Sequence, residues 1–174
     1  MHKKRTVRPA APKDIDALNA LRAPISELHA AGRPDVFKPG FPDGHRARLA
    51  AMLRAPQRYD ALVCEEKGRL LGFVLVEYVH IAETAGMYAQ HYAHVLELGV
   101  AENARGQGAG RQLMQAVAQR AAQRGCTAVR LDVWEFNAAA RAFYEALGYA
   151  PSVREMELAL PAGAQSGAND GENA

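Results

Sequence analysis

The chain has 174 residues, of which 49% are hydrophobic and 23% charged, and its formal net charge is +2 with the histidines neutral. These proportions are typical of globular domains and exclude the collagen-like, disordered and disulfide-scaffold classes. The length corresponds to one domain. The small positive excess is weaker than that of a dedicated nucleic-acid-binding protein.

Targeting and membrane signals are weak as well. The longest apolar run, Leu70 to Val76, is too short to cross a bilayer. The basic start of the chain, residues 1–5, is not followed by the apolar stretch of a signal peptide. Cys64 and Cys126 have the spacing of neither a disulfide framework nor a metal site. We therefore expect a cytoplasmic protein that binds no metal, no nucleic acid and no membrane.

The first elements in chain order are a strand and two helices. Residues 5–8 predict a short strand, and an amphipathic helix follows at 13–23, which Pro24 breaks or kinks. A second helix runs from residue 44 to about 54, with Asp43 as its cap.

Strands then dominate the middle of the chain. Residues 61–65 and 69–79 predict a hairpin around the turn at 67–68, and residues 93–100 predict a further strand.

The remaining elements alternate between helix and strand. They are a helix at 111–124, a strand at 128–134, a helix at 137–147 and a last strand at 154–160. The order β-α-α-β-β-β-α-β-α-β predicts a single α/β domain with a mixed, mostly antiparallel sheet. The unit from 93 to 134 predicts a right-handed parallel β-α-β crossover.

The end of the chain differs in composition. Residues 163–174 contain no strongly apolar side chain, so burial cannot offset the entropy lost on ordering them. We expect a domain over residues 1–162 and a disordered tail over 163–174.

A glycine-rich turn joins the strand at 93–100 to the next helix. It holds glycines at positions 106, 108 and 110, with arginines at 105 and 111. Such a turn points backbone N–H groups at one spot, at the positive end of a helix dipole. Without side chains, the three glycines let an anion approach the backbone. The turn predicts a phosphate or pyrophosphate site, and the alternative is a tight connection without a ligand.

Two phosphate motifs do not match this turn. A P-loop needs Lys-Ser/Thr after its last glycine, but Gly110 is followed by Arg111 and Gln112. The dinucleotide fingerprint needs a third glycine at the position that Arg111 occupies.

Two motifs carry a family resemblance. Arg105-x-x-Gly108-x-Gly110 resembles the Arg/Gln-x-x-Gly-x-Gly/Ala loop of the GNAT superfamily of N-acetyltransferases. The segment Asn137-x-x-Ala140-x-x-Phe143-Tyr144-x-x-x-Gly148-Tyr149 also looks like that family. The resemblance covers residues 5–160, including the order of the elements.

The resemblance implies acetyl-CoA as cosubstrate, with its pyrophosphate on the glycine loop and its pantetheine between splayed strands at 93–100 and 128–134. It implies backbone contacts from Leu98 and Val100 and a side-chain contact from Asn137. The full set of implied contacts is Leu98, Gly99, Val100, Arg105, Gly106, Gln107, Gly108, Ala109, Gly110, Arg111 and Asn137. A plain helix N-cap remains an alternative role for Asn137, and both roles can coexist.

Glu97 is the candidate base. A lysine-like amine has a pKa of ~10.4, so its deprotonation at pH 7 costs about 4.6 kcal/mol, and a carboxylate acting through a water can help. Strand alternation points the Glu97 side chain to the face opposite Leu96 and Leu98. By resemblance, the face that carries Glu97 borders the acceptor cleft. An exposed or salt-bridged carboxylate is the alternative.

Tyr144 is the candidate acid, because the resemblance places it where the family holds its general acid. A phenol can bond to the departing thiolate of the cosubstrate. Tyr144 lies one step round the helix from the buried stripe of Ala140, Phe143 and Leu147, at its edge. A tyrosine that packs at the edge of the core is the alternative.

His80, His91 and His94 lack the spacing of a zinc site, which leaves a role in acceptor binding or as the base open for one of them.

The leading hypothesis is direct transfer of an acetyl group from acetyl-CoA to a primary amine. A non-catalytic acyl-CoA-binding regulatory module is the alternative, and a nucleic-acid-binding domain using Arg105, Arg111, Arg120 and Arg124 is a third reading. The acceptor, a small molecule or a protein amine, stays unidentified, and a homodimer stays open.

Overall fold

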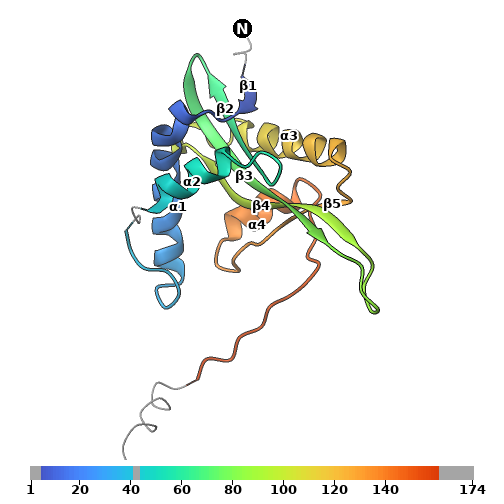
Figure 1. The fold of residues 1–174 in the computed structure, drawn as a ribbon. Coiled ribbons are helices and arrows are strands. Elements are labelled where there is room, and N and C mark those ends of the chain that lie inside the picture. Colours follow the sequence, from blue (N-terminus) through green and yellow to red (C-terminus); the bar gives the residue numbers. More distant parts are fainter. Residues whose placement is uncertain (1–4, 41–43, 161–174) are drawn as a thin grey trace, which may run out of the picture.

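The computed structural model describes residues 5–40 and 44–160. It holds one five-stranded sheet in the order β1-β2-β3-β4-β5, with helices on both faces (Figure 1). The strands are β1 (Thr6–Pro9), β2 (Tyr59–Glu66), β3 (Arg69–Ile81), β4 (Gln90–Val100) and β5 (Ala128–Leu131). The helices are α1 (Ile15–Gly32), α2 (Gly44–Leu53), α3 (Ala109–Gln123) and α4 (Ala138–Glu145), with short 3-10 turns η1 (Pro12–Asp14) and η2 (Glu102–Ala104).

The strand pairing confirms the predicted fold class. Each neighbouring pair is antiparallel except β4 and β5, which are parallel and are joined through α3. The chain is thus a single α/β domain with a mixed, mostly antiparallel sheet and one β-α-β crossover.

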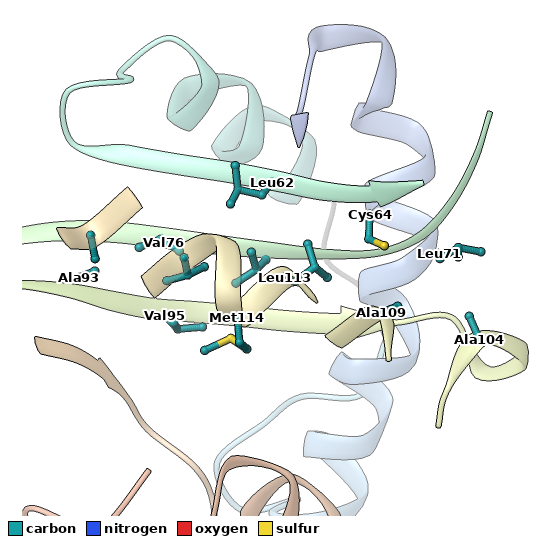
Figure 2. Close-up of a cluster of buried hydrophobic side chains, with 13 residues drawn as sticks. Leu62, Cys64, Leu71, Val76, Ala93, Val95, Ala104, Ala109, Leu113 and Met114 are labelled. Atoms are coloured by element: carbon teal, nitrogen blue, oxygen red, sulfur yellow. The ribbon is translucent and has the colours of Figure 1, made fainter. Parts of the chain in front are cut away.

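Two apolar cores lie on the two faces of the sheet. The α1 core lies on one face, where Leu18 of α1 and Leu49 of α2 pack on Phe73 of β3. The α3 core lies on the other face, and Figure 2 shows Leu113 and Met114 of α3 among side chains of β2, β3 and β4. Alternate residues of β2 and β3 enter the two cores, as expected for strands buried on both faces.

The sheet opens along the second half of β4. Pairing with β5 runs from Tyr92↔Ala128 to Val95↔Leu131, whereas β4 continues to Val100. On the β3 side the register shifts at this point, so that Leu96 is an extra residue on β4 and forms a β-bulge. A bulge bends a strand and increases its twist. The predicted splay between β4 and β5 therefore begins at Leu96.

Two predicted boundaries were wrong. Pro24 does not break the helix: α1 continues through it to Gly32, because the turns on either side keep Leu18, Leu21 and Ile25 on the core. β5 ends at Leu131 rather than at residue 134, because β4 bends away.

The last predicted strand, at 154–160, was also wrong. Residues 151–160 form no helix or strand and all are exposed. Apolar and polar residues do alternate here, which is why a strand was predicted. A strand also needs a neighbouring strand to accept and donate its backbone hydrogen bonds, and this segment runs away from the sheet (Figure 1). The expected tail at 163–174 and the expected cap Asp43 lie outside the described residues.

Candidate active site

The glycine loop connects β4 to α3 across the open part of the sheet. Gly106 and Gly108 have φ values of 69° and 87°, a backbone conformation that favours glycine. The first backbone bond of α3 runs from the Gln112 N–H to the Gly108 carbonyl, at 3.0 Å. The preceding amides of Ala109, Gly110 and Arg111 therefore belong to the first turn, whose N–H groups have no acceptor within a helix. These amides form the positive end of the α3 dipole.

Side chains from outside the loop fix its shape. Arg5 donates hydrogen bonds to the backbone carbonyl of Gln107 and, at 3.0 Å, to its Oε1. The Gln107 amide in turn donates to the carbonyl of Asn103 at 2.8 Å. Arg105 directs its Nε toward the carbonyl of Val100 at 3.4 Å. The side chains of Arg105 and Gln107 thus hold the loop, while Arg111 is exposed.

Gly110 has a different role from the other two glycines of the loop. A Cβ on Gly110 would lie 3.1 Å from the ring of Phe143 and 3.5 Å from Val100. A Cβ on Gly106 or Gly108 would meet no atom within 4 Å. That an anion approaches the backbone of all three glycines stays a prediction. The missing side chain of Gly110 makes room for Phe143 of α4, and the open space lies at Gly106 and Gly108.

Gly99 brings α1 close to β4. A Cβ there would lie 2.4 Å from the ring of Phe73 and 2.8 Å from Ile25. Leu98 and Val100, on either side of Gly99, pack into the α3 core instead. The missing side chain of Gly99 therefore serves packing directly under the site.

Glu97 is held by an arginine of α1. The Nε of Arg22 donates to Oε2 of Glu97 at 2.7 Å, and its Nη2 donates to Oε1. The Arg22 side chain is 2% exposed, whereas that of Glu97 is 24% exposed. Glu97 is thus a salt-bridged carboxylate at the border between the core and the splayed part of β4.

The bulge corrects one expectation about Glu97. Strand alternation predicted that Glu97 points away from both neighbours, but Leu96 packs into the α1 core, on the side where Glu97 meets Arg22. Only Leu98 lies on the opposite face. The extra residue of the bulge breaks the alternation.

Sequence reasoning missed Arg22. A signal was present, because Arg22 lies within the apolar stripe of α1, four residues after the buried Leu18 and three before Ile25. A buried arginine at such a position needs a carboxylate partner.

Two histidines of the α1–α2 side lie within electrostatic range of Glu97. Burial lowers the pKa of His29, although the charge of Glu97 opposes that shift. Burial lowers the pKa of His45 too, and the positive charge of Arg22 adds to the effect. Both imidazoles are therefore in the neutral form that can accept a proton at neutral pH.

Asn137 caps α4. Its Oδ1 accepts a hydrogen bond from the N–H of Ala140 at 3.1 Å, which confirms the N-cap role. The oxygen faces the helix, so the amide nitrogen is the part of the side chain that can donate to a ligand.

Tyr144 lies on α4 between two other rings. It packs edge-on against Phe143 and Tyr149, with ring centroids 5.2 and 5.7 Å away. Burial, with a smaller contribution from Tyr149, raises the pKa of Tyr144 to about 12. The phenol is therefore protonated at neutral pH and can donate a hydrogen bond.

An aromatic cluster joins the end of α1 to the segment between β5 and α4. His29 stacks on Phe37 at 5.1 Å, and Phe37 meets Trp134 edge-on at 5.4 Å. Phe136 lies against both His29 and Trp134. The cluster, composed of His29, Phe37, Trp134 and Phe136, fixes the segment that leads into Asn137 and α4.

The three histidines considered from the sequence lie in β3 and in the first half of β4, away from Glu97. They are His80, His91 and His94. His80 and His91 stack at 4.2 Å, and His91 lies 3.6 Å from the sulfur of Cys126. His94 pairs with Asp132 at 3.3 Å. Within the described residues, no group of three or more His, Cys, Asp or Glu is arranged to hold a metal ion.

Two of the arginines considered for nucleic-acid binding are engaged with the sheet. Arg120 donates to both carboxylate oxygens of Asp60, at 2.7 and 2.9 Å. Arg124 lies 3.5 Å from the same carboxylate and over the ring of Tyr78. Across residues 5–40 and 44–160, no helix is long and apolar enough to span a membrane.

Comparison with known families agrees with this geometry. The model of the acetyltransferase (GNAT) family matches residues 25–149. The chain belongs to this family. A search among curated proteins found no match.

Solved GNAT-fold structures cover nearly the whole chain. A mutant of the BH1408 protein from Bacillus halodurans is 27% identical, with a TM-score of 0.86 over 90% of this chain and 99% of that one. The aminoglycoside N-acetyltransferase AAC(6')-Iy in complex with CoA is 19% identical, with a TM-score of 0.71 over 92% and 97%. An aminoglycoside acetyltransferase from a soil metagenome, in complex with sisomicin, is 18% identical, with a TM-score of 0.63 over 90% and 97%.

The residues present fit acetyl-CoA, the cosubstrate that family membership supports. The open space at Gly106 and Gly108 borders the amides at the start of α3, which suit a diphosphate. Beyond Val95, the edge of β4 is not paired with β5 and can offer backbone groups to an amide-containing chain.

Proposed function

We propose that this protein transfers an acetyl group from acetyl-CoA to a primary amine. The observation that carries the proposal is the joint placement of three parts: the left-handed loop at Gly106 and Gly108, the unpaired half of β4, and α4 with Asn137 and Tyr144. Val100 at the end of β4 and Phe143 of α4 both lie within 3.5 Å of the Cβ position of Gly110, so the three parts meet at the start of α3.

In this proposal, different residues of the chain bind different parts of acetyl-CoA. The amides from Gly108 to Arg111 bind the diphosphate, with the guanidinium of Arg111 as a further charge. Backbone groups of Leu98 and Val100 bind the pantetheine amides along the free edge of β4, and the Asn137 amide donates from the α4 side.

Glu97 acts on the amine in this proposal, within limits set by Arg22. Both carboxylate oxygens already accept hydrogen bonds from the guanidinium, so Glu97 would give one up in order to accept a proton directly. With a water between the amine and the carboxylate, Glu97 can keep its hydrogen bonds to Arg22. The water then takes the amine proton while it is hydrogen-bonded to the carboxylate.

Tyr144 stabilises the departing thiolate by a hydrogen bond. A phenol with a pKa of about 12 is a weaker acid than a thiol with a pKa near ~8.5. Full proton transfer to the thiolate would therefore be uphill by roughly 5 kcal/mol. The hydrogen bond lowers the energy of the leaving group without that transfer.

The loop is tested by matched substitutions at the two ends of α3. Gly108 at its start and Gly125 just after its end have φ values of 87° and 74°, and a Cβ would meet no atom at either place. Alanine should cost about 1 kcal/mol of stability at both positions. We expect only Gly108→Ala to weaken acetyl-CoA binding in calorimetry, by about tenfold. Equal affinities for the two variants would contradict the proposed loop site.

The reaction is tested by following thiol release with acetyl-CoA and a panel of primary amines. We expect turnover on at least one amine and a fall in kcat of roughly 10- to 100-fold for Tyr144→Phe. Tight acetyl-CoA binding without turnover on any amine would favour the alternative, a non-catalytic acyl-CoA-binding regulatory module.

A further inference from the structure

The second half of α1 presents one face to the unpaired half of β4. Arg22, Ile25 and His29 are three and four residues apart, so they share this face of the helix. Arg22 binds Glu97, and Ile25 lies 2.8 Å from the position that a Cβ on Gly99 would take. His29 is therefore the next side chain along the face that already contacts β4 at two places.

The same face continues to the segment that leads into α4. The ring of His29 lies edge-on to that of Phe136, with centroids 6.1 Å apart. A Cβ on Gly32, three residues after His29, would collide with the same phenylalanine ring. Phe136 directly precedes Asn137, the N-cap of α4. His29 thus lies beside the segment from which the proposed Asn137 contact to pantetheine comes.

The ring of His29 is held in place while its nitrogens stay available. Phe37 stacks on one side of the ring at 5.1 Å, and Phe136 meets it edge-on. Within residues 5–40 and 44–160, neither ring nitrogen has a hydrogen-bond partner, and neither is buried away from water. A fixed, half-buried imidazole with accessible nitrogens can take a proton from a neighbouring water.

The charges around His29 suit a proton acceptor. Burial lowers the pKa of the imidazole, and the negative charge of Glu97 opposes that shift. The ring is therefore neutral at pH 7, and the carboxylate stabilises a proton once it has arrived. The other charged side chains on the segments around His29 are Arg22, which binds Glu97, Arg33, which pairs with Asp35 and Glu157, Glu135, which pairs with Arg141, and the exposed Lys38.

Glu97 alone is poorly suited to keep the proton of the amine. Both of its carboxylate oxygens accept hydrogen bonds from Arg22, so it can hold the water that receives the proton while the guanidinium favours its charged form. An imidazole, with an ordinary pKa near ~6.5, is a stronger base than a carboxylate with one near ~4.3. We propose, on the basis of the proposed acetyl transfer, that His29 is the final acceptor of the amine proton.

The proton path completes the balance of the reaction. The neutral amine attacks the thioester carbon, a C–N bond forms, and the nitrogen becomes positively charged. The C–S bond breaks, and its electron pair leaves with the sulfur as a thiolate that accepts a hydrogen bond from Tyr144. The nitrogen loses its proton through the water at Glu97 to the imidazole of His29, which later returns it to solvent.

The kinetic test replaces the imidazole by a ring that cannot take a proton. His29→Phe keeps a ring against Phe37 and Phe136, so we expect a folded protein by circular dichroism. At pH 7 its kcat should be roughly 100-fold lower, with a smaller deficit towards pH ~10, where hydroxide can take the proton. In the wild type, log(kcat/KM) should bend downwards below the pKa of His29, and this bend should be absent in the variant.

His45 provides the matched control. It is a second histidine within electrostatic range of Glu97, but it lies on α2, and burial lowers its pKa too. His45→Gln should keep both the rate and the bend. If His29→Phe is as fast as the wild type, or if the bend follows His45 instead, the inference is overturned while the acetyl transfer stands. Absence of turnover in the wild type on every amine would instead contradict the acetyl transfer, and the role of His29 with it.

A second test needs no turnover. Ring-proton NMR of the protein without acetyl-CoA titrates His29 directly, and its signal is the one that disappears in His29→Phe. We expect a pKa below 6.5 that falls further in Glu97→Gln, because the amide oxygen still accepts from Arg22 but carries no charge. A pKa that does not change in Glu97→Gln would show that the carboxylate and the imidazole do not face each other, and it would overturn the proton path.

Discussion

The two halves of β4 differ although they belong to one strand. Residues 90–95 pair regularly with β3, and residues 92–95 also have β5 on the other side. Residues 96–100 have β3 alone, begin with the bulge at Leu96 and include Gly99, where a side chain would collide with the core. The first half is held in the sheet by its pairing, and the second half leaves one edge of β4 unpaired.

Polar side chains show the same difference. In the first half, His91 and His94 are matched by close neighbours, Cys126 and Asp132. In the second half, Glu97 reaches across to Arg22 in a different layer of the molecule. The irregular half therefore depends on long-range contacts, and substitutions there should have larger effects than substitutions in the first half.

The largest effect is expected from the ion pair. Glu97→Ala leaves the guanidinium of Arg22, which is 2% exposed, without this carboxylate and should cost about 3 kcal/mol of unfolding free energy. Arg22→Met leaves a carboxylate that reaches water and should cost less, roughly 1–2 kcal/mol. Urea unfolding of both variants measures this asymmetry.

The double variant Arg22→Met with Glu97→Leu sharpens the test. Replacing both partners of a buried pair by apolar residues is often nearly neutral, so this variant should recover much of the stability lost in Glu97→Ala. It should remain inactive on amines if Glu97 has its proposed role. An active double variant would remove Glu97 from the reaction while keeping it in the fold.

The next effect is expected at Gly99. Its alanine variant places a Cβ 2.4 Å from the fully buried Phe73 ring of β3 and 2.8 Å from Ile25 of α1, so β4 must shift away from both side chains, at a cost of about 2 kcal/mol. Gly86 in the β3–β4 loop is the control, since a Cβ there meets no atom within 4 Å. Equal melting temperatures for Gly99→Ala and Gly86→Ala would show that the second half of β4 is as tolerant as an open loop.

Local patterns predicted most of the fold but not the irregular half of β4. The glycines at 106 and 108 and the helix start at Asn137 were readable because each is a local backbone requirement. The partner of Glu97 was not readable from the strand, because Arg22 lies 75 residues earlier in the sequence. The bulge depends on how β3 and β4 align, and the last strand failed because an alternating pattern does not say which backbone it will pair with.

The pH dependence of Tyr144 gives a smaller effect with a definite sign. Burial raises its pKa from about 10 in the unfolded chain to about 12, so the folded state favours the neutral phenol. The stabilisation of the folded state that comes from this raised pKa is fully present below pH ~10 and is lost as the pH rises through 12. Near pH 11 the loss amounts to about 1 kcal/mol. The phenolate difference absorbance between the wild type and Tyr144→Phe should therefore titrate near pH 12. A transition near the ordinary value would mean that the phenol lies in water, and it would weaken the case for a bond to the thiolate.

The smallest effect, at Asn137, separates a cap from a ligand contact. Asn137→Ala removes the bond to the Ala140 N–H and should cost about 1 kcal/mol of stability, whereas Asp at this position still caps the helix. Asp, however, has no amide nitrogen to donate. If Asn137 also binds pantetheine, Asn137→Asp should keep its melting temperature and raise the KM for acetyl-CoA about fivefold, the loss of roughly one hydrogen bond. An unchanged KM would show that Asn137 acts only as the N-cap of α4. Contacts from α4 to pantetheine would then have to come from other residues.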